Sequence, residues 1–114
     1  MDSTGNRNMF KIGTILTVIM VFQAHGAAFA AEHVVNQKNK SFSVKKLKIK
    51  SGDSIKFVND DSFAHNVFSL SATKGFDTGS FGSGQSKLVT FEKAGKVEVE
   101  CAIHPDMRLD VEVE

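Results

Sequence analysis

The chain has 114 residues, a formal net charge of +1 and a single cysteine. A nearly neutral chain lacks the strongly basic surface that nucleic-acid binding requires, so nucleic acid is not an expected partner. A single cysteine excludes an intramolecular disulfide, and in an oxidising compartment its thiol must be buried, partnered or bound to metal.

The first 30 residues have the order of a secretory signal peptide. The basic residues Arg7 and Lys11 precede an apolar run at 12–22, and the small-residue pattern Ala28-Phe29-Ala30 follows. The apolar run has about half of the roughly 20 residues that a membrane-crossing helix needs. We therefore predict a signal peptide at residues 1–30, cleavage near Ala30, and a periplasmic or otherwise exported protein. Membrane attachment is expected only if the leader stays uncleaved.

Residues 31–114 are expected to form one domain, because 84 residues suffice for one compact core but not for two. The leader carries two of the 14 basic residues and one of the 13 acidic residues, which leaves twelve of each. This balance gives no electrostatic indication of a partner, and we expect a monomer.

Alternation of apolar and polar residues predicts strands along most of this domain, and no run keeps a helical period for longer than one turn. Ser51-Gly52-Asp53 predicts a turn, so the strands on its two sides are expected to form a hairpin. Lys93-Ala94-Gly95 predicts a later turn. The expected strands are 44–50, 55–58, 65–70, 88–91, 97–101 and 109–113.

The stretch 71–85 is rich in Gly, Ser and Thr, and it contains Phe76 and Phe81. We predict an ordered loop here, because its two aromatic side chains can attach it to the core. About seven short strands with turns at this spacing indicate an all-β fold, an antiparallel Greek-key β-sandwich.

A short loop between the last two expected strands carries three metal-binding groups. Cys101, His104 and Met107 lie within seven residues, with two residues between each of them and the next. His65 would supply a fourth group from another strand. One thiolate and two imidazoles in a trigonal plane, with a weak thioether above them, match a site that stabilises both Cu(I) and Cu(II). Four protein ligands leave no open position, which disfavours hydrolysis and oxygen chemistry.

This loop resembles the ligand loop of the cupredoxins, the plastocyanin-like small blue-copper proteins. The short gap in His104-Pro105-Asp106-Met107 is the amicyanin-like spacing, since plastocyanins insert more residues before the methionine. The resemblance extends to 95–101, to the strand after the loop and to 60–67, so that it covers nearly all of residues 31–114.

The resemblance implies one type 1 copper ion held by His65 and His104 as imidazole ligands, Cys101 as thiolate and Met107 as axial sulfur. It implies that Asn66 forms hydrogen bonds near the cysteine sulfur and steadies the site. The implied function is electron transfer through the rim of His104, without transformation of a substrate, so the protein is expected not to be an enzyme. The expected partners are redox proteins, for instance a dehydrogenase or a c-type cytochrome.

Each ligand also has a simpler interpretation. Cys101 could be a small buried apolar residue, His65 a hydrogen-bonded histidine at a strand end, and Met107 core filler. The shared loop favours coordination. Because the thiol of Cys101 must lose its proton to bind metal, copper uptake is expected to weaken as the pH falls.

Two weaker hypotheses concern other residues. Phe63, Ile103 and Pro105 would form an apolar collar around His104 if this histidine lies at the rim, and a redox partner would dock there. Cleavage after Ala30 would expose Ala31-Glu32-His33, a terminus that can wrap Cu(II) in square-planar nitrogens.

Two other functions compete with the electron carrier. A periplasmic copper chaperone or storage protein would use the same ligands, although chaperones favour exposed sites with paired Cys or several Met. An adhesion module on the same sandwich would need no metal ligands, because fold alone does not determine function.

Overall fold

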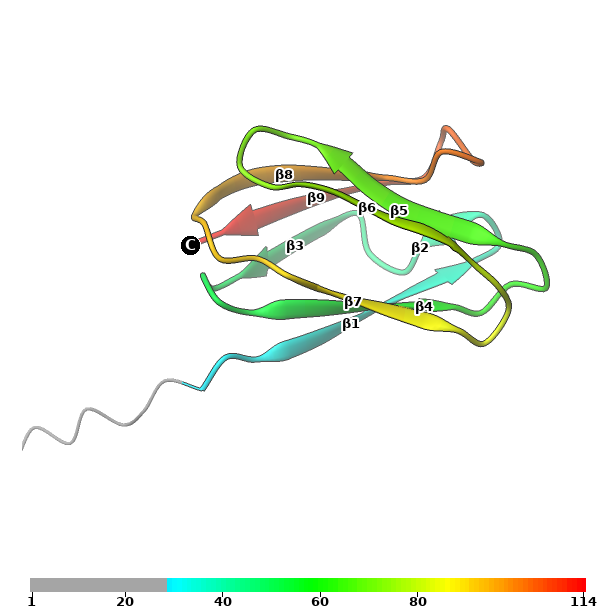
Figure 1. Cartoon of the computed structure of the whole chain (residues 1–114), viewed down its shortest axis with the longest axis horizontal. Helices are drawn as coiled ribbons and strands as arrows, with labels where there is room; N and C mark the ends of the chain where they lie inside the picture. The colour runs from blue at the N-terminus through cyan, green and yellow to red at the C-terminus, as the bar shows by residue number, and fades with distance from the viewer. Residues whose placement is uncertain (1–28) are drawn as a thin grey trace, which may run out of the picture.

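The computed structural model describes residues 29–114, which form a two-layer β-sandwich (Figure 1). The predicted signal peptide lies almost entirely outside the described residues. Within 29–114, no helix is long and apolar enough to cross a bilayer. The strands of this part are β1 (Glu32–Lys38), β2 (Ser41–Phe42), β3 (Lys46–Ile49), β4 (Ser54–Asn59), β5 (His65–Leu70), β6 (Gly75–Phe81), β7 (Ser86–Thr90), β8 (Gly95–Glu100) and β9 (Arg108–Val113).

The strands divide into a four-stranded sheet of order β2-β1-β4-β7 and a five-stranded sheet of order β3-β9-β8-β5-β6. The chain passes back and forth between the two sheets, so most strands that follow each other in the sequence lie in different sheets. The exceptions are the pairs β1 and β2, β5 and β6, and β8 and β9. β1 pairs with β4 in parallel and β3 pairs with β9 in parallel, whereas the other pairs are antiparallel. The predicted all-β sandwich is thus confirmed, and its sheets are mixed.

The core lies between the two sheets and is built by the alternation seen in the sequence. In β9 the side chains alternate strictly between exposed and buried, and β4 alternates between half-buried and buried. Each fully buried aliphatic or phenyl side chain contributes about 1.5–3 kcal/mol through the apolar surface that it removes from water. The fully buried apolar residues include Val35, Ile55, Phe57, Phe91, Val99 and Leu109.

The predicted hairpin around Ser51-Gly52-Asp53 is wrong. The turn is present, since the Asp53 amide donates to the Lys50 carbonyl, but the strands on its two sides belong to different sheets. β3 joins β9 and β4 joins β1 and β7. A local turn signal reports the reversal of the chain and not the partner of each strand, because each strand pairs where its apolar face is buried.

The predicted loop at 71–85 contains a strand, β6, that pairs with β5 at the edge of the five-stranded sheet. Its two aromatic residues anchor it as expected: Phe81 is buried, and the Phe76 ring meets Phe91 edge to face at a centroid distance of 6.0 Å. The alternation of apolar and polar residues that predicts a strand is weak in β6, because an edge strand with an exposed face tolerates Gly, Ser and Thr. β1 was likewise not predicted.

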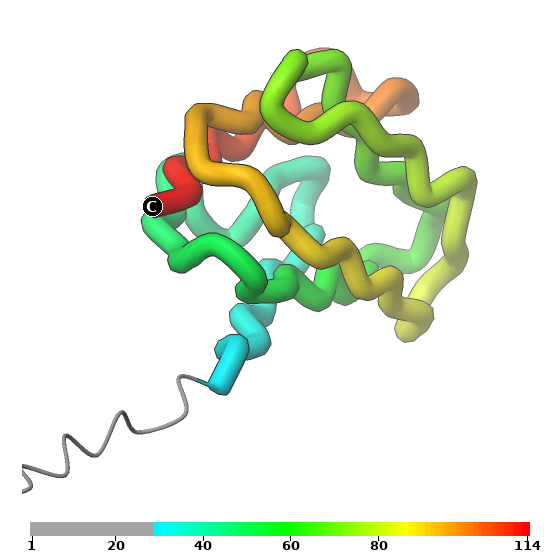
Figure 2. Tube along the Cα trace, turned by 60° about the vertical axis from the view of Figure 1, so that its left-hand side comes forward, coloured from blue at the N-terminus to red at the C-terminus, as the bar shows by residue number. Residues whose placement is uncertain are grey.

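The ligand loop between β8 and β9 lies at the end of the sandwich opposite the C-terminus (Figures 1 and 2). The connections from β1 to β2 and from β4 to β5 lie toward this same end (Figure 1). The fold therefore gathers these connections at one end. Three candidate metal ligands lie in the connection from β8 to β9, and the fourth, His65, begins β5.

Asp53, at the opposite end, ties the beginning of β1 to the rest of the domain. Its carboxylate accepts hydrogen bonds from the Ala31 amide (2.9 Å) and the Lys50 amide (3.0 Å), and it lies 2.9 Å from His33 Nε2. The hydrogen bond with His33, followed by those from the two amides, lowers the pKa of Asp53 from 3.8 to about 2. Because these contacts favour the ionised carboxylate, they stabilise the folded protein wherever Asp53 is charged.

We expect Asp53→Asn to destabilise the protein at neutral pH and to do so less as the pH falls. The contribution of Asp53 is complete above its unfolded pKa of about 3.8 and is lost as the pH falls through its folded pKa of about 2. Urea unfolding of the wild type and the variant between pH 7 and pH 2 measures this difference. Asp110→Asn, at an exposed carboxylate, controls for the loss of one charge, and a constant wild-type advantage across this range would contradict the assignment.

Candidate metal centre

The antiparallel pairing of β8 with β9 closes the loop that carries three of the predicted ligands. Glu100 pairs with Arg108, so the seven residues between them must reverse direction. The Met107 amide donates to the His104 carbonyl at 3.0 Å, which closes a turn with Pro105 at its second position, where a fixed φ near −65° is favourable. The loop thereby holds Cys101 and Met107 at its two ends, both buried.

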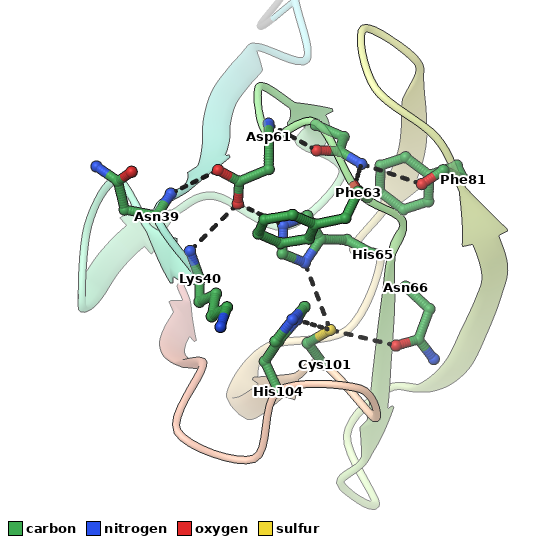
Figure 3. Close-up of polar contacts among 10 residues, drawn as sticks. Asn39, Lys40, Asp61, Phe63, His65, Asn66, Phe81, Cys101 and His104 are labelled. Carbon is green, nitrogen blue, oxygen red and sulfur yellow. Dashed lines mark hydrogen bonds and ion pairs between the residues drawn. The ribbon is translucent and has the colours of Figure 1, made fainter.

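His65 approaches the same point from the beginning of β5. Its Nδ1 lies 3.8 Å from the Cys101 Sγ, and the Nδ1 of His104 lies 3.7 Å from that sulfur (Figure 3). One donor atom from each of these three residues lies within 4.8 Å of the others. The structure thus brings the predicted thiol and both predicted imidazoles together, each histidine presenting the same ring nitrogen.

These separations fit a single metal ion. Donors held about 2.0–2.3 Å from a first-row ion such as zinc lie roughly 3.5–4 Å apart when they share a trigonal plane. The two sulfur–nitrogen distances fall in this range. A soft thiolate with two imidazoles and a nearby thioether is the donor set of a type 1 copper site. The residues present therefore fit copper.

Asn66 connects the loop to β5 where the regular ladder between β5 and β8 is minimal. These two strands share one paired position, Phe68 with Glu100. Nearer the site, the Asn66 Oδ1 accepts a hydrogen bond from the Ala102 amide at 2.8 Å and lies 3.4 Å from the Cys101 Sγ. The Asn66 side chain thus serves the Ala102 amide as acceptor in place of a backbone carbonyl. It also holds the Cys101 sulfur in place, as the resemblance implied.

A β-bulge lies next to this contact. The register of β5 with β6 shifts between Asn66 and Phe68, where Gly79 has a φ of 70° and the Val67 amide donates to the Thr78 Oγ1. Bulges disrupt a ladder locally and redirect neighbouring side chains. Here three consecutive residues, from His65 to Val67, are all buried.

Asp61 supports His65 on the side away from the sulfur (Figure 3). Its Oδ2 lies 2.7 Å from the His65 Nε2, and both groups are buried. Burial raises the pKa of Asp61, but the hydrogen bonds from His65 and from the Asn39 and Lys40 amides outweigh this effect and lower the pKa overall. The carboxylate is therefore ionised at neutral pH.

His104 is the one ligand of the three that is partly exposed. Burial lowers its pKa, and the charges of His65 and Lys40 act in the same direction against the opposing effect of Asp61. A lowered pKa keeps the imidazole neutral and able to bind metal. The Phe63 ring packs against both imidazoles, with centroid distances of 5.2 Å to His65 and 5.3 Å to His104.

The residues of the predicted collar are exposed around His104. Phe63 is 39% exposed and Ile103 is 52% exposed, and Pro105 is also exposed. These three residues therefore form an apolar surface beside the partly exposed His104, as the collar hypothesis requires. Docking of a partner there stays a proposal.

Copper binding by Ala31-Glu32-His33 after cleavage stays a prediction, and in the structure two of its nitrogens have a protein partner. The Ala31 amide and the His33 Nε2 both contact Asp53, and Glu32 and His33 lie in β1, paired with β4.

Asp61 is the functional residue that the sequence analysis missed. It occurs four residues before His65 in an irregular segment, where spacing along the chain does not predict contact. Its signals in the sequence are its place in a run of polar residues directly before a predicted ligand and its place in the stretch 60–67 that resembles the cupredoxins.

Solved structures with this architecture include copper proteins. A methionine-to-alanine variant of amicyanin in the Cu(I) state is 27% identical with a TM-score of 0.69, and the match covers 73% of this chain and 82% of that one. A reduced proline-to-glycine variant of amicyanin is 28% identical with a TM-score of 0.68 and the same coverage.

A copper-containing nitrite reductase from Thermus scotoductus SA-01 is 29% identical with a TM-score of 0.68. That match covers 73% of this chain but only 22% of the reductase, so this chain corresponds to a small part of that enzyme.

No curated protein matches the chain. The family described as copper binding proteins, plastocyanin/azurin family, matches residues 29–114, which is most of the sequence and contains every candidate ligand. With the convergence of His65, Cys101 and His104 beside Met107, this match shows that the chain is a cupredoxin with a His-Cys-His-Met copper site.

Proposed function

We propose that this protein is an exported blue-copper protein that carries single electrons between redox partners and transforms no substrate. The observation that carries the proposal is a closed donor set with one partly exposed member. Cys101, His65 and Met107 are at most 2% exposed, whereas His104 reaches the surface. Bound copper would supply the one-electron chemistry.

The supporting contacts favour a site that changes little during electron transfer. Asn66 holds the end of β8, the turn at Pro105 holds His104, and Asp61 holds His65. Ligands fixed in this way resist rearrangement, so a change of charge on the ion is accompanied by little movement of the protein. Such rigidity suits an electron carrier better than a chaperone, which must release its ion.

The exposed edge of His104 supports one route for the electron. Phe63 and Ile103 surround it with apolar surface, which a partner can cover without breaking many hydrogen bonds to water. The His104 ring would then lie between the buried sulfur and the partner. We propose that a redox protein, such as a dehydrogenase or a c-type cytochrome, docks at this collar.

Titration of the purified protein with Cu(II) is expected to give one equivalent of binding and intense visible absorption, because the Cys101 thiolate donates charge to the ion. Cys101→Ser should abolish this absorption, since the chain has no other thiol. Met107→Leu, a change of similar volume, should retain it. Visible spectroscopy during the titration measures both variants.

The same preparation separates the electron carrier from its competitors. Repeated reduction and oxidation in the presence of a Cu(I) chelator should leave the copper in the protein. Rapid loss to the chelator would indicate a chaperone instead, and failure of the folded wild type to take up copper would exclude both.

Ile103→Asp is expected to slow electron exchange at least tenfold while the absorption spectrum and the reduction potential stay nearly unchanged. The reason is that a charge in the collar opposes docking but does not touch the ligands. Stopped-flow mixing with a c-type cytochrome measures the rate. Leu70→Asp is the matched control, because Leu70 is 85% exposed at the far end of β5 from His65. Equal slowing by both variants would argue against docking at the collar.

We propose export on the basis of the leader predicted at residues 1–30, and this proposal is tested separately. Expression of the full chain in a bacterium with a periplasm should yield a mature protein that begins near Ala31, recovered from the periplasmic fraction. Intact-mass analysis identifies the terminus. A cytoplasmic product that keeps residues 1–30 would contradict export.

A further inference from the structure

We propose that Asp61 is a positioning residue for the copper site and that the tip of the β1–β2 hairpin, Asn39-Lys40, holds its carboxylate in place. The inference builds on the copper site and does not depend on electron transfer to a partner. It connects a hairpin that contributes no ligand to the ligand His65.

The contact with Asp61 determines which ring nitrogen of His65 carries the proton. Both oxygens of the Asp61 carboxylate accept hydrogen bonds from backbone amides of Asn39 and Lys40, so Asp61 acts as an acceptor and the contact of 2.7 Å between its Oδ2 and the His65 Nε2 places the proton on Nε2. The other ring nitrogen, Nδ1, is then left with a free lone pair. It is this Nδ1 that lies 3.8 Å from the Cys101 Sγ. Asp61 thus selects the form of His65 that can bind metal, before any metal arrives.

Two backbone amides at the tip of the hairpin hold the Asp61 carboxylate in place. The Asn39 amide donates to its Oδ1 at 2.7 Å, and the Lys40 amide donates to its Oδ2 at 3.2 Å. Asn39 and Lys40 both have a positive φ, 54° and 57°, and this pair of left-handed residues is typical of a two-residue hairpin turn. Two consecutive residues in this conformation direct both amides toward the same carboxylate (Figure 3).

Further hydrogen bonds, made by Asn59, surround Asp61. Asn59 accepts a hydrogen bond from the Asp61 amide at 2.9 Å and donates to the carbonyls of Phe63 and Phe81, so the segment before His65 is fixed at several points. The Lys40 Nζ lies 5.9 Å from the centre of the Phe63 ring, which covers both imidazoles. The hairpin tip therefore contacts the site through its amides and through its side chain.

The consequence is electrostatic as well as geometric. A buried negative charge next to a ligand stabilises Cu(II) more than Cu(I), because the ion with two charges is attracted more strongly. Asp61 should therefore lower the reduction potential. Its loss should weaken copper binding by about 10–100-fold, the range common for partners of metal-ligating histidines.

The test compares Asp61→Asn with Asp60→Asn, two neighbouring changes that each remove one negative charge. Asp60 is exposed and forms its hydrogen bond with Asn36. In Asp61→Asn, one side-chain oxygen becomes an NH₂ group that must face a donor, either the Asn39 amide or the pair formed by His65 and Lys40. We expect this variant to lower the ratio of Cu(II) to Cu(I) affinity about tenfold, which raises the potential by about 59 mV for one electron.

Asp60→Asn should change the same ratio less than twofold, because an exposed charge is screened by solvent. Voltammetry and competition with copper chelators measure the ratio in the copper-loaded proteins. A similar shift in both variants, or none in Asp61→Asn, would overturn the inference while leaving the copper site and the electron carrier intact.

A measurement on the wild type covers the case in which Asp61→Asn does not fold. Long-range proton–nitrogen NMR of the copper-free protein at neutral pH should show His65 with its proton on Nε2 alone and with slow exchange of that proton. A proton on Nδ1 would overturn the inference.

Discussion

The antiparallel register of β8 and β9 is the constraint on which the copper site depends. Because Glu100 pairs with Arg108, Cys101 and Met107 must be the first and last residues of a reversal, and His104 must lie between them. The loop is too short to move its members apart while the ladder is intact. A sandwich that buries Leu109 and Val99 on the same strands fixes this ladder, so core packing and ligand geometry are parts of one arrangement.

Around this constraint, the site is held by groups that are not ligands. The Asn66 side chain replaces a missing ladder contact, Asp61 orients His65, and the Phe63 ring packs against both imidazoles. Each of these residues comes from β5 or from the connection before it. The same short segment thus supplies one ligand and most of the contacts that keep the ligands in position, which gives the site rigidity without a disulfide.

The distribution of exposure gives the site a direction. The sulfur and His65 are buried, while the His104 ring reaches solvent within an apolar surround. Burial excludes water from the thiol, and the partly exposed ring leaves one path toward the outside. The negative charge of Asp61 lies on the buried side, next to His65, and the positive charge of Lys40 lies near the exposed rim, over the Phe63 ring. The charge next to a ligand and the surface that a partner could reach are therefore on different sides of the site.

The sequence by itself determined the three ligands of the Cys101–Met107 loop and the fold class, whereas the structure brings His65, 36 residues before Cys101, to that loop. Ligand spacing in Cys101–Met107 is local, and alternation in strands such as β9 reports directly on which face is buried, so both could be read from neighbouring residues. Only the tertiary structure decided what depends on distant pairing: that β3 and β4 separate into two sheets, that the Gly-rich stretch contains β6, and that Asn39-Lys40 meets Asp61. Strand partners are chosen by burial across the whole core, and a contact between two irregular segments leaves no periodic signal, which is why local patterns do not contain this information.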